Sequence, residues 1–186
     1  MWLQAEWYIR ALSISDVKVL REKVQGCFDG AAISTGCDIE IEWLADTAVN
    51  DWEHGAHVYA NMVSNGPMCE SFRENWAALG QPDWPTQAED EAKSVTGGGS
   101  TDMGNVSHIL PSIHPSFKID TQYGNHHPGF TEFTAKPHNL ETARVAGKAV
   151  AMTALDLMYS PEMVAAAVED WEAKAERRDW TVEIAM

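Results

Sequence analysis

The stretch that decides how this chain is interpreted runs from Gly97 to Phe130 and reads GGGSTDMGNVSHILPSIHPSFKIDTQYGNHHPGF. It combines a glycine run and a Ser-Thr-Asp triplet with four of the chain's seven histidines: His108, His114, His126 and His127. Imidazole and carboxylate groups on a flexible backbone are what a metal-dependent hydrolytic site requires. The rest of the chain supplies few further ligands, so the stretch predicts part of such a site.

The bulk composition limits the class of protein. The chain has 186 residues, of which 45% are hydrophobic and eight are Trp, which is enough apolar material for one domain or two small ones. The formal net charge is -15, from 28 acidic and 13 basic residues. Binding to phosphate groups needs clustered Lys and Arg, so we expect neither a nucleic-acid partner nor an anionic membrane. An acidic surface is also the ordinary property of a soluble protein.

The cysteines and the hydropathy pattern indicate a compartment. Cys27, Cys37 and Cys69 are odd in number and lack the CxxC spacing, so a disulfide framework is not expected and a reducing compartment is. The first ten residues, MWLQAEWYIR, lack the pattern of a signal peptide. No segment is apolar enough to span a bilayer. These observations predict a cytoplasmic protein.

The first third reads strand, helix, strand. Polar and apolar residues alternate over residues 5–12 and again over 37–43, the period of a half-buried strand. Between them, Ser13 with Asp16 resembles a capping box and Gly36 is a natural end for a helix. The apolar face of that helix is Val17, Leu20, Val24, Cys27, Phe28 and Ala31. So small a unit buries little surface, so we expect partner strands from a second copy or from a preceding half of the domain.

The remainder is predicted to be mostly helical. Pro67 opens a helix that ends at Gly80, residues 81–99 form a loop, and residues 106–110 and 117–119 form short strands. Asn139 caps a further helix, whose small residues are expected to pack against a sheet. Its predicted inward face is Leu140, Ala143, Gly147, Val150, Ala154 and Leu157. Ser160 and Pro161 start the last helix, with Val164, Ala167, Val168, Trp171 and Ala175 inward.

Residues 99–117, GSTDMGNVSHILPSIHPSF, resemble a signature near the C-terminus of the aminoacylase-like zinc metallopeptidases, peptidase family M twenty. The most similar subgroup is the amidohydrolases that include β-alanyl-lysine dipeptidase and aminobenzoyl-glutamate hydrolase. Three further blocks are similar to the same family, so the resemblance covers nearly the whole chain. They are EWYIRAL with the following CFDGAAISTGCDIEIEW, then NHHPGFTEF, and finally ETARVAGKAVAMTALDLMYSPEM.

The resemblance implies a fold and a set of site residues. The fold class would be α/β, with residues 1–66 forming the second half of a ferredoxin-like lid or dimerisation domain. Residues 67–186 would form the C-terminal segment of the catalytic domain. His126 matches the last zinc ligand, and His127 is a weaker candidate. The loop that would line the substrate cleft, where backbone N–H groups can hold a carboxylate, consists of Gly98, Gly99, Ser100, Thr101 and Asp102.

Alternatives to a role in the site stay open for several of these residues. Asp102 is either a partner that orients a histidine or a cap of the turn that follows the glycines. For His108, His114 and His138 a structural role is favoured over a metal ligand. For His126 the resemblance favours the ligand, although stable zinc sites use three or four ligands.

The same resemblance implies an incomplete enzyme. The family's other zinc ligands occur in a His-x-Asp pair and beside a Glu-Glu pair, and this chain contains neither. We therefore expect a fragment of a zinc-dependent dipeptidase or amidohydrolase acting on dipeptides or N-acyl amino acids, inactive alone. The alternative is a non-catalytic module that pairs through an exposed strand edge with a second copy or a full-length relative. A truncated gene product without a separate function is the third interpretation.

Overall fold

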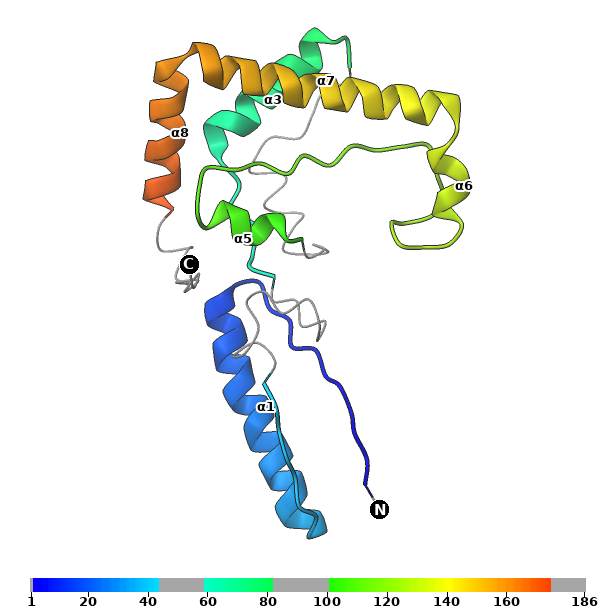
Figure 1. The fold of residues 1–186 in the computed structure, drawn as a ribbon, viewed down its shortest axis with the longest axis vertical. Coiled ribbons are helices and arrows are strands. Elements are labelled where there is room, and N and C mark those ends of the chain that lie inside the picture. The colour runs from blue at the N-terminus through cyan, green and yellow to red at the C-terminus, as the bar shows by residue number, and fades with distance from the viewer. Residues whose placement is uncertain (1, 44–58, 82–100, 175–186) are drawn as a thin grey trace.

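The structure, a computed structural model, describes residues 2–43, 59–81 and 101–174, and the regular elements within these ranges are helices (Figure 1). One isolated parallel β-bridge joins Ser64 to Ser112. The helices are α1 (Ile14–Thr35), α3 (Gly66–Ala78), α5 (Met103–Ser107), α6 (Phe130–Thr134), α7 (Pro137–Tyr159) and α8 (Pro161–Ala173). The predicted α/β fold class and the division into domains at residue 66 remain predictions.

Helix α1 begins and ends where the sequence indicates. The hydroxyl of Ser13 accepts a hydrogen bond from the Asp16 amide at 3.1 Å, which satisfies one of the free N–H groups of the first turn. Gly36 adopts a left-handed conformation with φ 67°, and its N–H donates to the carbonyl of Ala32. Glycine adopts this conformation without the steric cost of a side chain. Both predicted caps are confirmed.

The two segments predicted to be strands flank α1 without pairing to any strand in the described part of the chain. Residues 2–11 and 37–43 run beside the helix as irregular chain (Figure 1). Trp7 contacts Phe28 of α1 edge-on, with ring centroids 6.0 Å apart, and the indole of Trp43 donates to Gln25. Alternating hydrophobicity is not sufficient for a sheet, because a strand also needs an adjacent strand as hydrogen-bond partner.

Helix α3 also begins and ends where the sequence predicts. The side chain of Asn65 caps it by accepting from the Met68 amide at 3.2 Å, and Pro67 occupies the first turn, where it costs no backbone hydrogen bond. Phe72 and Trp76 are buried, and Gly80 ends the helix at φ 75°. The two large aromatic side chains of this helix therefore form its buried face.

The predicted inward face of α7 is wrong. The buried residues of this helix are Asn139, Val145, Ala146, Ala149 and Thr153. Leu140, Gly147, Val150 and Ala154, which were expected inside, are exposed. Apolar residues lie on both sides of α7, so the periodicity does not select one of them. The partner selects it, because the aromatic rings of α3 pack best against the side that carries small residues.

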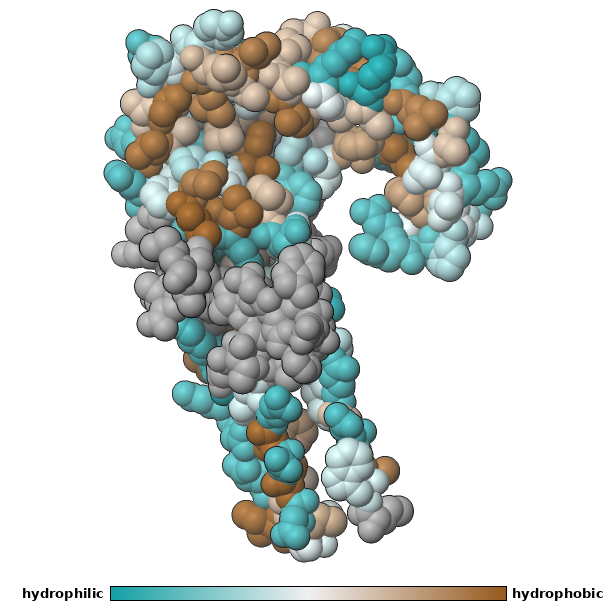
Figure 2. All heavy atoms as spheres, in the orientation of Figure 1, coloured by the Kyte–Doolittle hydropathy of each residue, from teal (hydrophilic) through white to brown (hydrophobic). Residues whose placement is uncertain are grey.

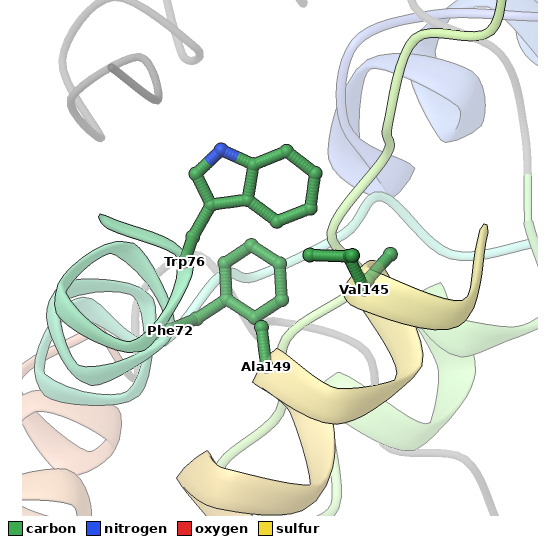
Figure 3. Close-up of a cluster of buried hydrophobic side chains, with 5 residues drawn as sticks. Phe72, Trp76, Val145 and Ala149 are labelled. Atoms are coloured by element: carbon green, nitrogen blue, oxygen red, sulfur yellow. The ribbon is translucent and has the colours of Figure 1, made fainter. Parts of the chain in front are cut away.

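The core lies where α3 crosses α7 (Figure 3). Phe72 and Trp76 stack with ring centroids 6.1 Å apart and pack against Val145, Ala146 and Ala149 of α7. Phe72 is only 2% exposed. Burial of such side chains contributes about 1.5–3 kcal/mol each, so this cluster is the main apolar stabilisation of the described body.

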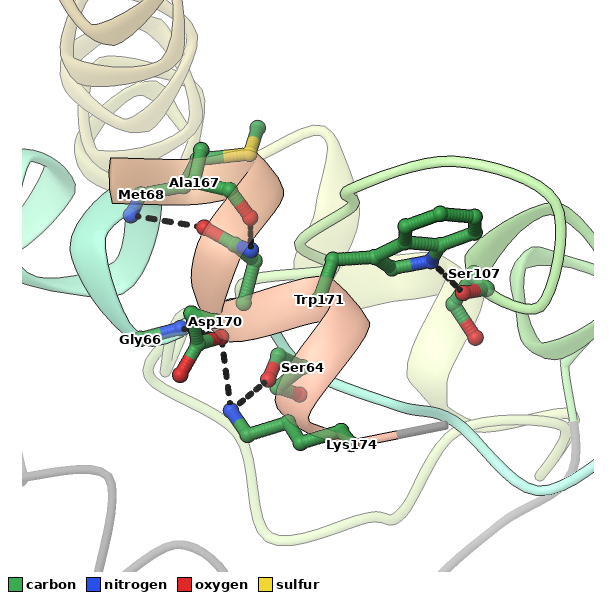
Figure 4. Close-up of polar contacts among 9 residues, drawn as sticks. Ser64, Gly66, Met68, Ser107, Ala167, Asp170, Trp171 and Lys174 are labelled. Carbon is green, nitrogen blue, oxygen red and sulfur yellow. Dashed lines mark hydrogen bonds and ion pairs between the residues drawn. The ribbon is translucent and has the colours of Figure 1, made fainter. Parts of the chain in front are cut away.

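Polar contacts fix α8 and α7 to α3. Asp156 on α7 accepts hydrogen bonds from Ser71 and Asn75 on α3, both at 2.7 Å. Helix α8, which starts at its predicted Ser160 cap, binds the start of α3 on the other side (Figure 4). There Asp170 accepts from the Gly66 amide at 3.0 Å, and Asn65 donates to the carbonyl of Ala167 at 2.7 Å. Helices α3, α7 and α8 therefore form one body, and α1 lies outside their packing.

Candidate functional site

The predicted substrate loop is described at its last two residues. Thr101 is half-buried and Asp102 is exposed, while Gly98, Gly99 and Ser100 lie outside the described residues. The hydroxyl of Thr101 accepts from the Met103 amide at 3.3 Å and donates to the Asp102 carboxylate at 3.4 Å. Asp102 precedes α5, and its carboxylate does not cap the helix. The side chain of Asp102 therefore stays exposed at the end of the loop.

The strand predicted at residues 106–110 is wrong, because the chain there forms α5 and a turn. Helix α5 covers Met103–Ser107, and the amides of Ile109 and Leu110 both donate to the carbonyl of Val106. A short apolar run fits either a strand or a helix turn by periodicity alone. The polar residues beside it decide the outcome, since the side chains of Asn105 and Ser107 accept hydrogen bonds from the backbone of segment 60–63.

His126, the predicted metal ligand, lies in an exposed turn before α6. Its φ of 67° makes it the non-glycine residue with a left-handed backbone in the described ranges. That conformation costs an L-residue about 1–2 kcal/mol. Asn, Asp and His tolerate it better than other side chains, and such outliers cluster at functional sites. Tight turns commonly need one residue with positive φ, so the backbone at His126 fits an ordinary turn as well as a functional one.

The turn around His126 is built from aromatic packing. The rings of Tyr123 and His127 stack with centroids 4.5 Å apart and planes 6° from parallel, and Tyr123 meets Phe133 of α6 edge-on. The Nδ1 atom of His127 accepts from the Gly129 amide at 3.0 Å. A Cβ atom at Gly129 would lie 2.7 Å from the Tyr123 ring, so this position needs glycine. The turn thus has a defined conformation.

Asn139 anchors this turn to the first turn of α7, and it differs from its prediction. It was expected to cap the helix, but Lys136 occupies that position and Asn139 is buried within the first turn. Its carbonyl oxygen accepts from the Asp120 amide at 2.8 Å. Its amide group donates to the carbonyls of Asp120 and Phe133. The signal that sequence analysis missed is an amide side chain beside a helix start, which can bind a neighbouring loop as well as its own helix.

His108, His114 and His138, which the structure describes, behave as structural or surface residues. His108 is buried, and its Nε2 lies 3.0 Å from the carbonyl oxygen of Asn61. A ring nitrogen that faces a carbonyl oxygen must donate, so Nε2 carries a proton. His138 lies 3.3 Å from the Asp120 carboxylate, with both side chains exposed, and His114 is exposed. The structural interpretation of His108 is confirmed.

The described residues of the two predicted parts of the site lie apart. Helices α5 and α6 lie at well-separated points of the body, so the loop end at Asp102 and the turn before α6 are apart (Figure 1). Among the described residues, no group of three or more His, Cys, Asp or Glu side chains has the arrangement of a metal site. One candidate ligand does not meet the three or four that a stable zinc site needs, so these residues alone do not fit a zinc ion.

Comparison with known proteins gives a clear relationship. Two curated proteins named Xaa-Arg dipeptidase match this chain. The mouse protein is 36% identical over 169 residues, which is 90% of this chain. The human protein is 35% identical over 176 residues, or 94% of this chain. The chain is similar to these dipeptidases. No protein-family model matches it.

The match covers most of this chain but a much smaller share of each relative. The chain spans 36% of the length of each Xaa-Arg dipeptidase that it matches. The predicted resemblance to a dipeptidase is confirmed at that level, and the finer subgroup stays a prediction. In the part of the chain that the structure describes, no helix is both long enough and apolar enough to cross a membrane.

Proposed function

We propose that this chain contributes to amide-bond hydrolysis of the dipeptidase type, with dipeptides that end in arginine as the first substrate class to test. The observation that carries the proposal is the similarity to Xaa-Arg dipeptidases over 90% or more of the chain. N-acyl amino acids are the related class, since they present the same amide bond and carboxylate. The net charge of -15 does not itself identify a basic substrate.

In this proposal the described residues would bind the substrate carboxylate and contribute one ligand to a zinc ion. The loop that ends at Thr101 and Asp102 would hold the substrate carboxylate through backbone N–H groups, as glycine-rich turns do. His126 would hold a zinc ion together with ligands from outside the described residues. Zinc supplies Lewis acidity and lowers the pKa of a bound water. Because one ligand does not retain zinc, we expect little or no hydrolysis by residues 1–186 alone.

Zinc content is the first test of this proposal. Elemental analysis of the purified chain, washed with a chelator and then restored with zinc, measures retained metal per chain. The matched variants are His126→Ala and His114→Ala, both at exposed positions. Near-stoichiometric zinc that is lost only in His126→Ala would establish the ligand. Equal amounts of retained zinc in all three proteins would remove His126 from the site, whereas no retained zinc in any of them would support an incomplete site.

Substrate recognition is tested separately with Ala-Arg and with its C-terminal amide, which lacks the carboxylate. Backbone NMR signals of Thr101 and Asp102 should shift with Ala-Arg and not with the amide. Identical shifts with both ligands would refute recognition of the carboxylate by this loop. Hydrolysis of Ala-Arg by the zinc-loaded chain would contradict the expected inactivity and leave the substrate class intact.

The second candidate function is a non-catalytic interaction module, and exposed apolar side chains favour it. Trp7 and Tyr8 are 71% and 75% exposed, and Met158 near the end of α7 is 78% exposed. Apolar surface, brown in Figure 2, also lies over α7 and α8. Such surface marks association sites when it is contiguous. Light scattering should then detect a dimer of this chain or its complex with a full-length relative. A chain that stays monomeric and does not bind such a relative would exclude this function.

A further inference from the structure

Residues 60–63 belong to no helix or strand, yet both ends of this segment are buried. Ala60 and Val63 are each 4% exposed. Buried backbone groups without partners are costly, so this segment needs hydrogen bonds from elsewhere. The Ala60 amide donates to Oδ1 of Asn105 at 2.7 Å, and the Val63 amide donates to Oγ of Ser107 at 2.9 Å. Side chains of α5 thus bind the backbone of a segment more than forty residues away.

Helix α5 lies directly on this segment. A Cβ atom at Gly104 would lie 1.9 Å from the carbonyl oxygen of Ala60, so no larger residue fits without displacing the helix. Ser107 is fully buried, and its hydroxyl also donates to the carbonyl of Gly104 at 2.6 Å. The Ser107 hydroxyl therefore accepts one hydrogen bond, from Val63, and donates its proton in another, to Gly104.

The same residues continue into the loop. The Gly104 amide donates to the carbonyl of Thr101, and the Asn105 amide donates to the carbonyl of Asp102, both at 3.0 Å. Gly104 and Asn105 thus contact Ala60 on one side and hold Thr101 and Asp102 on the other. A shift of α5 relative to Ala60 must move the backbone of both loop residues.

The opposite end of α5 is tied to the helical body. The indole of Trp171 on α8 donates to the carbonyl of Ser107 at 3.0 Å (Figure 4). Segment 60–63 is continuous with Ser64 and Asn65, which α8 holds through Lys174 and the carbonyl of Ala167. Helix α5 and segment 60–63 are therefore both held by α8 and the Lys174 that follows it. These contacts fix the position of Thr101 and Asp102.

We propose that Asn105 and Ser107 are positioning residues for the substrate loop: by binding the Ala60 and Val63 amides they fix Thr101 and Asp102 for the carboxylate. The role of the loop in binding rests on the proposed function. The coupling between segment 60–63 and the loop end does not depend on it.

The experiment compares four full-length variants with the parent chain by amide hydrogen exchange and NMR. Asn105→Leu removes the acceptor, and Asn105→Asp retains an oxygen at the same place. Ser107→Ala removes the hydroxyl. Ser34→Ala is its matched control, because the Ser34 hydroxyl makes the same kind of bond to the carbonyl three residues earlier but lies exposed on α1.

Asn105→Leu is expected to accelerate exchange of the Ala60 amide about tenfold, the factor for one lost buried hydrogen bond. It should also shift the Thr101 and Asp102 signals and weaken Ala-Arg binding at least about fivefold, within the usual range of a positioning effect. Asn105→Asp should restore all three readouts. Ser107→Ala should accelerate exchange at Val63, and Ser34→Ala should change none of them.

Two results would overturn the proposal. The first is unchanged exchange at Ala60 in Asn105→Leu. The second is faster exchange at Ala60 with the Thr101 and Asp102 signals in their original places, since the contact would then be structural only. If the parent chain does not bind Ala-Arg, the proposed function fails, while the exchange and ligand-free shifts still decide the coupling.

A glycine pair keeps the test independent of Asn105. Gly104→Ala should shift the Thr101 and Asp102 signals because its Cβ meets the Ala60 carbonyl. Gly26→Ala on α1 is the control, since a Cβ there meets no atom within 4 Å. Loop signals that stay in place in folded Gly104→Ala would also refute the proposal.

Discussion

Two regions of the molecule contain similar residues but differ in how far they bury them. One is α1 with its flanking segments, and the other is the body formed by α3, α7 and α8. Both contain aromatic pairs, but Phe72 and Trp76 are buried between two helices, whereas Trp7 remains 71% exposed against Phe28. The helices of the body share a core, whereas among the described residues α1 has its two irregular flanks beside it (Figure 1). A helix gains most of its stability from burying an apolar face, so the body should be stable and the α1 region weak.

The largest expected difference comes from the aromatic residues. Phe72→Ala should lower the free energy of unfolding by about 3–5 kcal/mol, because it leaves a cavity between α3 and α7. Phe28→Ala in α1 should lower it by about 1 kcal/mol or less, as for a partly exposed site. Urea unfolding followed by circular dichroism measures both values. Equal losses would show that the α1 region has a core of comparable quality.

The next difference concerns polar contacts. Asp156→Ala leaves the hydroxyl of Ser71 and the amide of Asn75 without their shared acceptor, at a cost of about 1–3 kcal/mol. Asp29→Ala removes an exposed acceptor of Gln25 on α1 and should change stability by about 0.5 kcal/mol or less. The same unfolding measurement applies. A larger loss of stability from Asp29→Ala than from Asp156→Ala would contradict the expectation that the α1 region is the weaker one.

A smaller effect is expected where α1 meets residues 37–43. The guanidinium of Arg21 lies 4.6 Å from the centre of the Trp43 ring, and the Trp43 indole donates to Gln25 at 3.0 Å. Trp43→Ala should cost about 1 kcal/mol and release this segment from α1. Amide exchange should rise in residues 37–43 and stay unchanged in α3. Faster exchange in both places would mean that the two regions unfold together.

The smallest effect is a pH dependence within α3. Arg73 donates hydrogen bonds to the Glu70 carboxylate and holds the pKa of Glu70 below its ordinary value of 4.5. A lowered folded pKa means that the stabilisation is present above pH 4.5 and is lost as the pH falls through the folded pKa. Because the pair is exposed, Glu70→Gln should cost only about 0.3–0.5 kcal/mol at neutral pH.

The measurement for this pair is thermal unfolding between about pH 3 and about pH 7, a range that brackets the ordinary carboxyl pKa. Glu74→Gln is the control for the change in charge. The difference between the parent chain and Glu70→Gln should shrink on acidification and with added salt. A difference that grows at low pH would contradict the direction of the pKa shift.

The relationship to dipeptidases was predictable from the sequence, and the contacts of the candidate residues were not. The GSTDMGNVS block identified the relationship to dipeptidases, which the comparisons support. The left-handed backbone at His126 and the anchoring of its turn by Asn139 were not predictable. An amide side chain has several competing partners at a helix start, and sequence does not say which of them folding brings close.

The sequence by itself determined both ends of α1 and of α3 and the start of α8. Capping depends on backbone groups within one turn, so the local sequence is enough to specify it. The residues that begin or end a helix in this way are Ser13, Gly36, Pro67, Gly80 and Ser160. Tertiary structure alone decided which face of α7 is buried and that residues 103–107 form a helix. Both outcomes depend on residues distant in the chain, the rings of Phe72 and Trp76 in one case and the backbone of Ala60 and Val63 in the other. Periodicity records local preference, whereas burial follows from the partner that folding supplies.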